Sequence, residues 1–252
     1  MIFLDAIRRC YADAWRFSHA LFPLVAIAVG IEGLQHVVEW REGLYASAAA
    51  MGAHAMDPGR MITGGLKVLW LLILAYWTAR FVVTGSAQQT LARDPVAVRK
   101  FAWVMVLNVL LAVPVLYGPL LLPALGAARR AAQLTLLGFQ LVSFPIGVFL
   151  VPWAVGSALG DPRATLAFSF RRATNSFWLG LAVLLLAPLP ILALHYALGY
   201  AAVGKPSGLA IAYLIFDAPV AALTGVVAGV SQAIVAQRMA ERAGEPLRLD
   251  LA

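Results

Sequence analysis

The sequence carries little charge, and its central part carries almost none. Asp, Glu, Lys and Arg make up 12% of the 252 residues, whereas a soluble domain carries roughly 25%. Between Phe101 and Leu159 the only charged residues are Arg129 and Arg130. The apolar stretch on each side of this pair is long enough to cross the hydrocarbon core of a bilayer, which takes about 20 helical residues. The scarcity of charge therefore excludes an ordinary soluble domain and predicts a membrane protein.

Cysteine and catalytic motifs are also scarce. The chain has one cysteine, Cys10, so an intramolecular disulfide is excluded. Hydrolase, zincin, nucleotide-binding and dinucleotide-binding motifs are absent, and the four histidines are scattered. We therefore expect neither a cofactor nor a familiar type of enzyme. The N-terminus lacks the pattern of a cleaved signal peptide, so we expect the first membrane helix to act as an uncleaved anchor.

Hydrophobic residues make up 62% of the chain and gather into six blocks. This pattern predicts an all-α polytopic membrane protein with six transmembrane helices. We expect a single membrane domain over residues 1–243 and a cytoplasmic tail over residues 244–252. The expected spans are residues 19–40, 64–84, 101–126, 132–159, 177–200 and 208–236, the last of which is interrupted at Asp217-Ala218-Pro219.

The positive charges lie in short segments between the blocks, which explains the net charge of +7 without nucleic-acid binding. With the N-terminus inside, twelve Lys and Arg residues fall on the inner side: Arg8, Arg9, Arg16, Arg93, Arg99, Lys100, Arg163, Arg171, Arg172, Arg238, Arg242 and Arg248. Six fall on the outer side: Arg41, Arg60, Lys67, Arg129, Arg130 and Lys205. The positive-inside rule then predicts that both termini are cytoplasmic, and we expect the inner membrane of a bacterium.

Amphipathic interfacial helices are expected before spans 1, 3 and 5. Residues 1–18 form the first, with Phe3, Leu4, Ile7, Cys10, Tyr11, Ala14 and Trp15 on one face. A charged cytosolic start to the first span is the alternative. Asp94-Pro95 and Asp161-Pro162 both match the pattern of a helix start, with Asp as the N-cap and proline in the first helical turn. They predict a surface helix before spans 3 and 5.

Small residues and prolines are patterned within the spans. In the sixth span four small residues recur every four positions and predict close packing of two helices: Ala221, Gly225, Gly229 and Ala233. We favour an internal helix contact, and a homodimer seam is the alternative. The third, fourth and fifth spans contain prolines, which predict kinks.

Polar residues within the apolar blocks are the best candidates for a site. Glu32, His36 and Glu39 share one helical face, with Gln35 beside them. His195, Asp217 and Lys67 also map to the outer half of the membrane. Charged residues inside spans usually face the bundle interior and have partners. We therefore predict a polar site for a substrate or ion, comprising Glu32, His36, His195, Asp217 and Lys67.

Each of these residues also has a plainer interpretation. Glu32, Gln35, His36 and Glu39 can form the solvated outer end of the first helix, and His195 can be a hydrogen-bonded core histidine. Asp217 can be an N-cap, with the sixth span starting at Ala218; we favour this interpretation over an intramembrane acid. Because Glu-x-x-x-His spacing is not a metal signature, we expect no metal site.

Two segments carry a resemblance to a known family. Residues 168–181, FSFRRATNSFWLGL, and residues 232–245, QAIVAQRMAERAGE, are similar to stretches before the fifth span and at the end of six-helix bacterial membrane proteins. That group includes the YciC-type inner-membrane proteins and the membrane domain of some glycerophosphodiester phosphodiesterases. The resemblance implies the fold and the inner-membrane location. It carries over no catalytic residue, since these 252 residues hold no phosphodiesterase domain.

Three functions are consistent with the sequence. We favour a non-enzymatic protein that organises membrane or envelope components, or a partner complex. The alternative is a transporter or lipid-handling channel that uses the outer polar site, and the third is an intramembrane enzyme. Membrane lipids are the expected partners, together with a second copy or another membrane protein at the sixth span.

Overall fold

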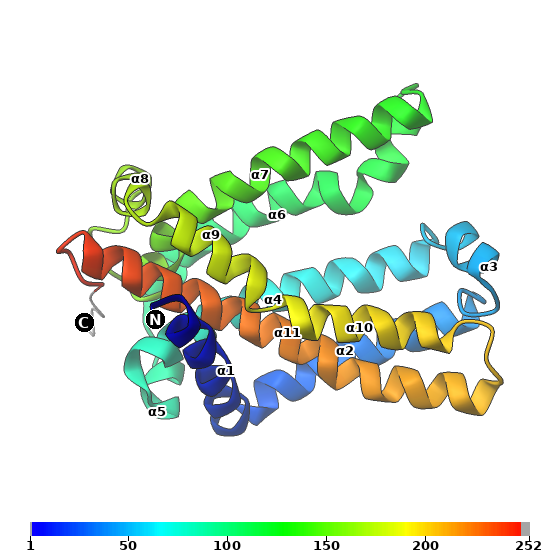
Figure 1. Cartoon of the computed structure of the whole chain (residues 1–252), viewed down its shortest axis with the longest axis horizontal. Coiled ribbons are helices and arrows are strands. Elements are labelled where there is room, and N and C mark those ends of the chain that lie inside the picture. The colour runs from blue at the N-terminus through cyan, green and yellow to red at the C-terminus, as the bar shows by residue number, and fades with distance from the viewer. Residues whose placement is uncertain (1, 248–252) are drawn as a thin grey trace.

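A computed structural model describes residues 2–247, and within this range every regular element is a helix (Figure 1). The eleven helices of the described range are α1 (Ile2–Ala20), α2 (Phe22–Arg41), α3 (Ala48–Ala53), α4 (Pro58–Thr84), α5 (Ala87–Leu91), α6 (Pro95–Ala124), α7 (Arg129–Ala158), α8 (Leu166–Thr174), α9 (Phe177–Leu186), α10 (Leu189–Ala202) and α11 (Ser207–Arg242). The all-α prediction is confirmed.

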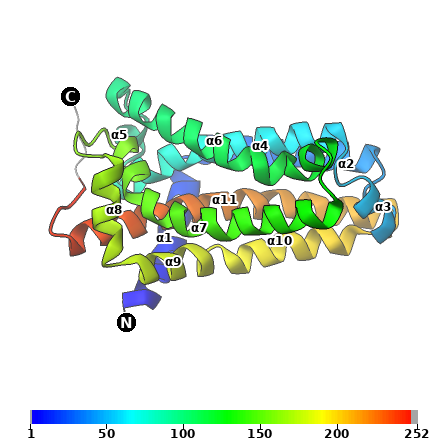
Figure 2. The ribbon, with the colours of Figure 1, turned by 90° about the horizontal axis from the view of Figure 1, so that it is seen from above.

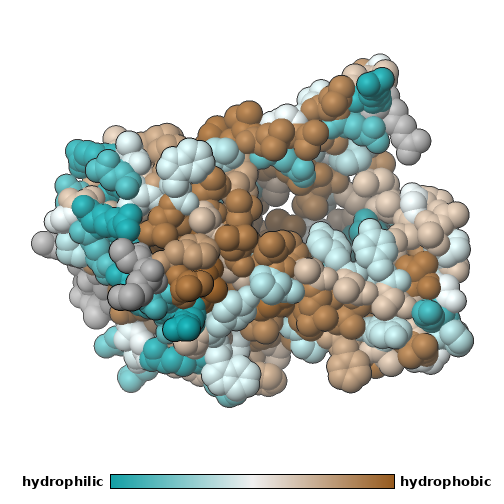
Figure 3. Space-filling view, in the orientation of Figure 1, coloured by the Kyte–Doolittle hydropathy of each residue, from teal (hydrophilic) through white to brown (hydrophobic). Residues whose placement is uncertain are grey.

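Six segments of the described chain are long and apolar enough to cross a membrane: α2, α4, α6, α7, α9 with α10, and α11. They run along the same axis, and both termini lie at one end together with α5 and α8 (Figures 1 and 2). Apolar residues cover the middle of the face in Figure 3, and hydrophilic residues gather at the end that holds the termini. The protein is a multi-pass membrane protein.

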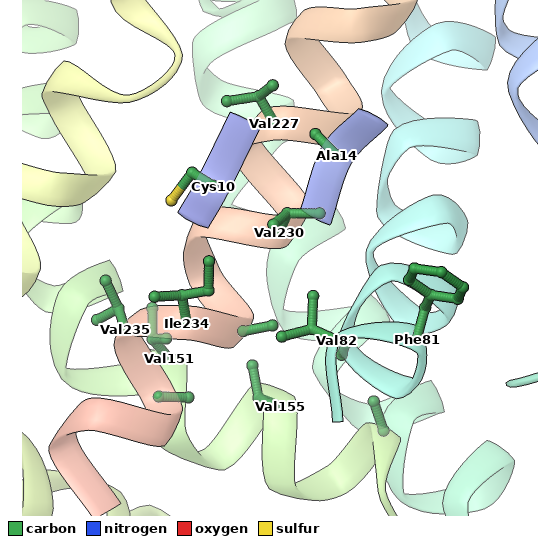
Figure 4. Close-up of a cluster of buried hydrophobic side chains, with 14 of the residues drawn as sticks. Cys10, Ala14, Phe81, Val82, Val151, Val155, Val227, Val230, Ile234 and Val235 are labelled. Carbon is green, nitrogen blue, oxygen red and sulfur yellow. The ribbon is translucent and has the colours of Figure 1, made fainter. Parts of the chain in front are cut away.

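Helix α11 lies at the centre of the bundle, in contact with α1, α2, α4, α7, α8, α9 and α10. Its buried valines and isoleucine pack with Cys10 and Ala14 of α1 and with Val151 and Val155 of α7 (Figure 4). This central position requires small residues where a neighbouring helix approaches α11 closely.

The small-residue stripe of α11 packs inside the chain, as expected. A side chain at Gly225 would collide with Leu71, and one at Gly229 would collide with Thr78, both on α4. Glycine therefore allows the two helices to approach closely.

We expect Gly229→Leu to destabilise the fold by about 1–3 kcal/mol, because the added side chain overpacks the α4–α11 contact. Reversible unfolding in mixed detergent micelles measures the change. Gly138→Leu is the control, since nothing lies within 4 Å of a Cβ at that exposed position. Equal stability of the two variants would contradict the close approach.

The N-terminal segment is an amphipathic helix, as predicted, but part of its apolar face packs against the protein. Ala6, Cys10, Ala14 and Phe17 of α1 are buried in the core, whereas Trp15 is 67% exposed. Helix α1 crosses the bundle axis near the termini (Figure 1).

The two Asp-Pro motifs differ in structure. Asp94 caps α6, and its carboxylate accepts a hydrogen bond from the Ala97 amide at 2.8 Å. This helix continues directly into the third span, so the separate surface helix expected to start at Asp94-Pro95 is wrong; the short α5 precedes the cap instead. Asp161 starts no helix, because its carboxylate pairs with Arg163. Helix α8 begins after Thr165, whose hydroxyl accepts from the Phe168 amide.

The C-terminal residues of the described chain do not form a free tail. Arg172 donates to the Glu245 carbonyl, and Arg163 donates to the Pro246 carbonyl. The expected tail over residues 244–252 therefore begins against α8, and residues 248–252 lie outside the described part.

The prolines have different effects. The fifth span is broken between Leu186 and Leu189, with Pro188 at the junction of α9 and α10. Prolines remain inside α6, α7 and α11. The arginine pair that begins α7 lies at the tip of the α6–α7 hairpin, which diverges from the other spans at this end (Figure 1).

Candidate functional site

The structure gathers the predicted polar residues into one buried cluster at the end of the bundle away from the termini. Glu32, His36 and Glu39 project from one face of α2 and are 1%, 6% and 3% exposed. The interpretation of these residues as the solvated end of the first helix is therefore wrong. They meet residues from α4 and α11, which lie beside α2, and His195 of α10 joins the cluster through Asp217 of α11.

Asp217 lies within α11 and is fully buried. The N-cap interpretation is wrong, because α11 begins ten residues earlier at Ser207 and continues through Pro219. Ten helical residues correspond to about 15 Å, so this carboxylate lies well inside a helix that is long and apolar enough to cross a bilayer. Its position is that of an intramembrane acid.

The two carboxylate oxygens of Asp217 face two histidines from different helices. Oδ1 is 2.8 Å from Nδ1 of His195 on α10, and Oδ2 is 3.0 Å from Nε2 of His36 on α2. His195 is therefore a hydrogen-bonded histidine within the cluster, so the two interpretations of this residue are compatible. Asp217 thus joins the first span to the fifth and sixth.

Glu32 forms the second ion pair of the cluster. Its oxygens lie 3.0 and 3.2 Å from Nζ of Lys67 on α4, and one of them lies 3.7 Å from Nε2 of His36. Lys67 keeps 25% of its side chain exposed. A small hollow with room for about one water molecule opens beside Glu32 and Lys67, with Trp70 in its wall.

Glu39 is held by four partners, of which the sequence had placed only Gln35 and His36 near it. Oε1 accepts from Gln35 at 2.8 Å and from Arg60 at 2.9 Å, and Oε2 accepts from the Tyr45 hydroxyl at 2.5 Å. Nδ1 of His36 is 3.3 Å from the same Oε2. Burial, together with the Glu39 carboxylate, raises the pKa of Tyr45 and keeps its hydroxyl protonated as a donor.

Tyr45 and Arg60 were missed because both lie outside the apolar blocks. Tyr45 lies in the segment between α2 and α4, and Arg60 lies in the first turn of α4, before the apolar part of that helix, where no periodic pattern marks a residue as buried. A tyrosine that follows a glutamate by six residues is not a recognisable signal. Arg60 was counted only as an outer loop charge.

Two polar atoms of the cluster are close together without being hydrogen bonded. Nε2 of His36 and Oδ2 of Asp217 are both buried, and neither has a hydrogen-bond partner of suitable geometry among the described residues. Together with Glu32, the two groups can each offer one ligand atom with all separations within 4.8 Å.

Comparison with protein-family models, curated proteins and solved structures found no match to this chain. The chemistry of the cluster is therefore the basis for a functional assignment. It can bind and release a cation, because three carboxylates and two imidazoles face one another across three spans.

Proposed function

We propose that this protein is a transporter for a small cation, and that the buried cluster of Glu32, His36, His195 and Asp217 is its binding site. The observation that carries the proposal is the burial of three carboxylates within the apolar spans. A carboxylate at the centre of a membrane helix costs about 2.5–3.5 kcal/mol on insertion scales, and such residues mark ion and proton pathways. A protein that needed only helix packing would not need them.

A broken helix and an intrahelical proline near the cluster support transport. His195 lies on α10, seven residues after Pro188 at the break in the fifth span, and Pro219 follows Asp217 by two residues within the continuous α11. Proline removes a backbone hydrogen bond and so weakens the helix locally. Discontinuous helices at a polar site within the membrane are typical of secondary transporters.

Cation uptake into liposomes tests this proposal. Protein in liposomes loaded with a pH-sensitive or metal-sensitive dye is given an inward gradient of H⁺, Na⁺, Ca²⁺, Mn²⁺ or Zn²⁺. We expect uptake of at least one cation, and Asp217→Asn should slow its initial rate at least about tenfold, equivalent to 1.4 kcal/mol or more in the barrier. Asp57→Asn is the control, because Asp57 pairs only with the partly exposed His54 outside the cluster.

Uptake equal to that of protein-free liposomes for every cation would contradict the proposal. The role in organising membrane components or a partner complex would then be favoured. In that role, cluster variants should change the abundance of the protein in the membrane or have no effect. Lipids remain the proposed partners, and a second copy remains possible only through surfaces other than the stripe that α4 covers.

The proposed orientation places both termini in the cytoplasm of a bacterial cell, on the basis of the twofold excess of inner positive charge. Labelling of single engineered cysteines with a membrane-impermeant maleimide tests it. Ala127→Cys, in the α6–α7 turn, should react in intact cells, whereas Ala92→Cys should react only after lysis. The native Cys10 should give little background, because burial raises the pKa of its thiol to about 12. The reverse labelling pattern would invert the topology.

A further inference from the structure

The three groups that converge in the cluster have the separations of metal ligands. Nε2 of His36 lies 3.0 Å from Oδ2 of Asp217 and 3.7 Å from Oε1 of Glu32. In a tetrahedral zinc site with bonds of about 2.0–2.1 Å, neighbouring ligand atoms are about 3.3 Å apart. These two separations lie on either side of this value, and all three ligand atoms lie within 4.8 Å of one another, so side-chain adjustments can bring them around one ion.

The lack of a hydrogen bond at the close contact is an independent sign of a ligand. The His36 side chain is 8% exposed and that of Asp217 is 1% exposed, yet neither Nε2 nor Oδ2 has a hydrogen-bond partner of suitable geometry. Buried polar atoms are nearly always satisfied in folded proteins. Their 3.0 Å ion pair brings them together without a well-directed hydrogen bond, and a cation bound by both atoms would satisfy them.

The opposite side of each ligand is held by a second residue. Nδ1 of His36 faces Oε2 of Glu39 at 3.3 Å and the Tyr45 hydroxyl at 3.1 Å, which directs Nε2 toward Asp217. Oδ1 of Asp217 is held by His195, which leaves Oδ2 free to bind. A carboxylate behind the ligating histidine is typical of zinc sites, where it fixes the tautomer and the ring orientation.

The ligand types select among cations. One imidazole nitrogen and two carboxylates suit zinc and related transition metals, which accept three protein ligands and leave one position for water. Calcium takes six to eight oxygen ligands and magnesium requires octahedral oxygen coordination. The cluster offers neither arrangement.

Lys67 competes with a metal for Glu32. The formal charges of Glu32, Glu39 and Asp217 sum to −3, and Lys67 and Arg60 contribute +2, which leaves −1 with both histidines neutral. Without Lys67 the same groups carry −2, which a divalent cation neutralises. The partly exposed Lys67 side chain can leave Glu32 when the ion arrives and return when it departs.

We propose that Glu32, His36 and Asp217 bind a divalent transition metal of the zinc class, and that Lys67 exchanges with the metal on Glu32. The inference rests on the proposed function, because it names the ligand of the same cluster. It also differs from the expectation that the Glu-x-x-x-His spacing supports no metal site. The spacing was uninformative because Asp217 comes from a helix 181 residues away.

Isothermal titration calorimetry of the purified, chelator-treated protein in detergent with ZnCl₂ tests the site. We expect one saturable site per chain. His36→Gln and Asp217→Asn should weaken zinc binding at least about 100-fold, whereas Glu39→Gln, behind the ligand, should weaken it about 10–100-fold. His54→Gln is the matched control, because His54 pairs with Asp57 outside the cluster and should leave the affinity unchanged.

Lys67→Met separates this proposal from a loss of folding. Removal of the competing ammonium should strengthen zinc binding about tenfold, equivalent to about 1.4 kcal/mol. An excess of MgCl₂ or CaCl₂ should not displace the zinc. Absence of saturable binding, equal weakening by His54→Gln and His36→Gln, or weaker binding in Lys67→Met would overturn the inference.

The metal-binding and uptake experiments can contradict the two proposals independently. Uptake of another cation without zinc binding would contradict the proposed metal site and leave the proposed transport function standing. Zinc binding without uptake of any cation would support the metal site and contradict the proposed transport function.

Discussion

Arg80→Met destabilises the protein by about 3–5 kcal/mol, because it leaves a buried charge and several carbonyls without their partner. Arg80 of α4 is fully buried at the end of the bundle that holds the termini. Its guanidinium pairs with Asp94 at 3.1 Å and donates to the carbonyls of Thr90 and Ala158 at 3.1 and 3.2 Å. One side chain thus joins the second span, the α5 turn, the cap of the third span and the end of the fourth.

The measurement is reversible unfolding in mixed micelles, combined with the level of folded protein in membranes. Arg99→Met is the matched control, because Arg99 is exposed on the first turns of α6 and surface substitutions of this kind change stability by less than about 0.5 kcal/mol. A similar small change in both variants would show that Arg80 is not the anchor of this end.

Glu39→Ala has the second large effect, also about 3–5 kcal/mol, because it removes the shared acceptor of a buried network. Arg60, Gln35 and Tyr45 all donate to this carboxylate. Its loss removes the carboxylate acceptor of the buried Tyr45 hydroxyl and releases the segment between α2 and α4.

Glu241→Ala is the control for this variant. Its carboxylate pairs with Arg238 at 3.2 Å but is about half exposed, and an exposed pair contributes at most about 1 kcal/mol. Reversible unfolding in mixed micelles should show a much larger loss of unfolding free energy for Glu39→Ala than for Glu241→Ala. If Glu241→Ala were as damaging as Glu39→Ala, the buried network would have no special role.

The six spans were predictable because each depends on local composition. An apolar block of about 20 residues has no stable alternative to a helix in a bilayer, so hydropathy alone located all six. The Asp94 cap was also predictable, since its partner amide is three residues away. The errors at helix ends, such as the start of α4 at Pro58 rather than residue 64, arose where polar residues continue a helix beyond its apolar part.

The site was predictable in its residues but not in its contacts. Polar side chains within apolar blocks identified Glu32, His36, Lys67, His195 and Asp217, and the structure brings all five together. Asp217 was interpreted as a helix cap because Asp followed by proline is the usual pattern of a helix start. Tertiary packing overrides that local signal, since α10 and α2 supply the partners of the buried carboxylate.

Asp161 is a second position where a local sequence motif predicted the wrong structure. Its pattern matches that of Asp94, yet it binds Arg163 in a turn and the following helix starts at Thr165. Sequence spacing did not distinguish the two, because the difference lies in the donor that each carboxylate binds: the Ala97 amide for Asp94, and the Arg163 amide and guanidinium for Asp161.

A double-mutant cycle between His36 and Asp217 tests most directly that residues distant in sequence form one buried unit. Unfolding free energies of the wild type, His36→Gln, Asp217→Asn and the double variant are measured in mixed micelles with a chelator present. The 3.0 Å separation of the two side chains predicts a coupling of at least about 1 kcal/mol. Additive effects, within about 0.5 kcal/mol, would contradict the cluster and, with it, the proposed cation site.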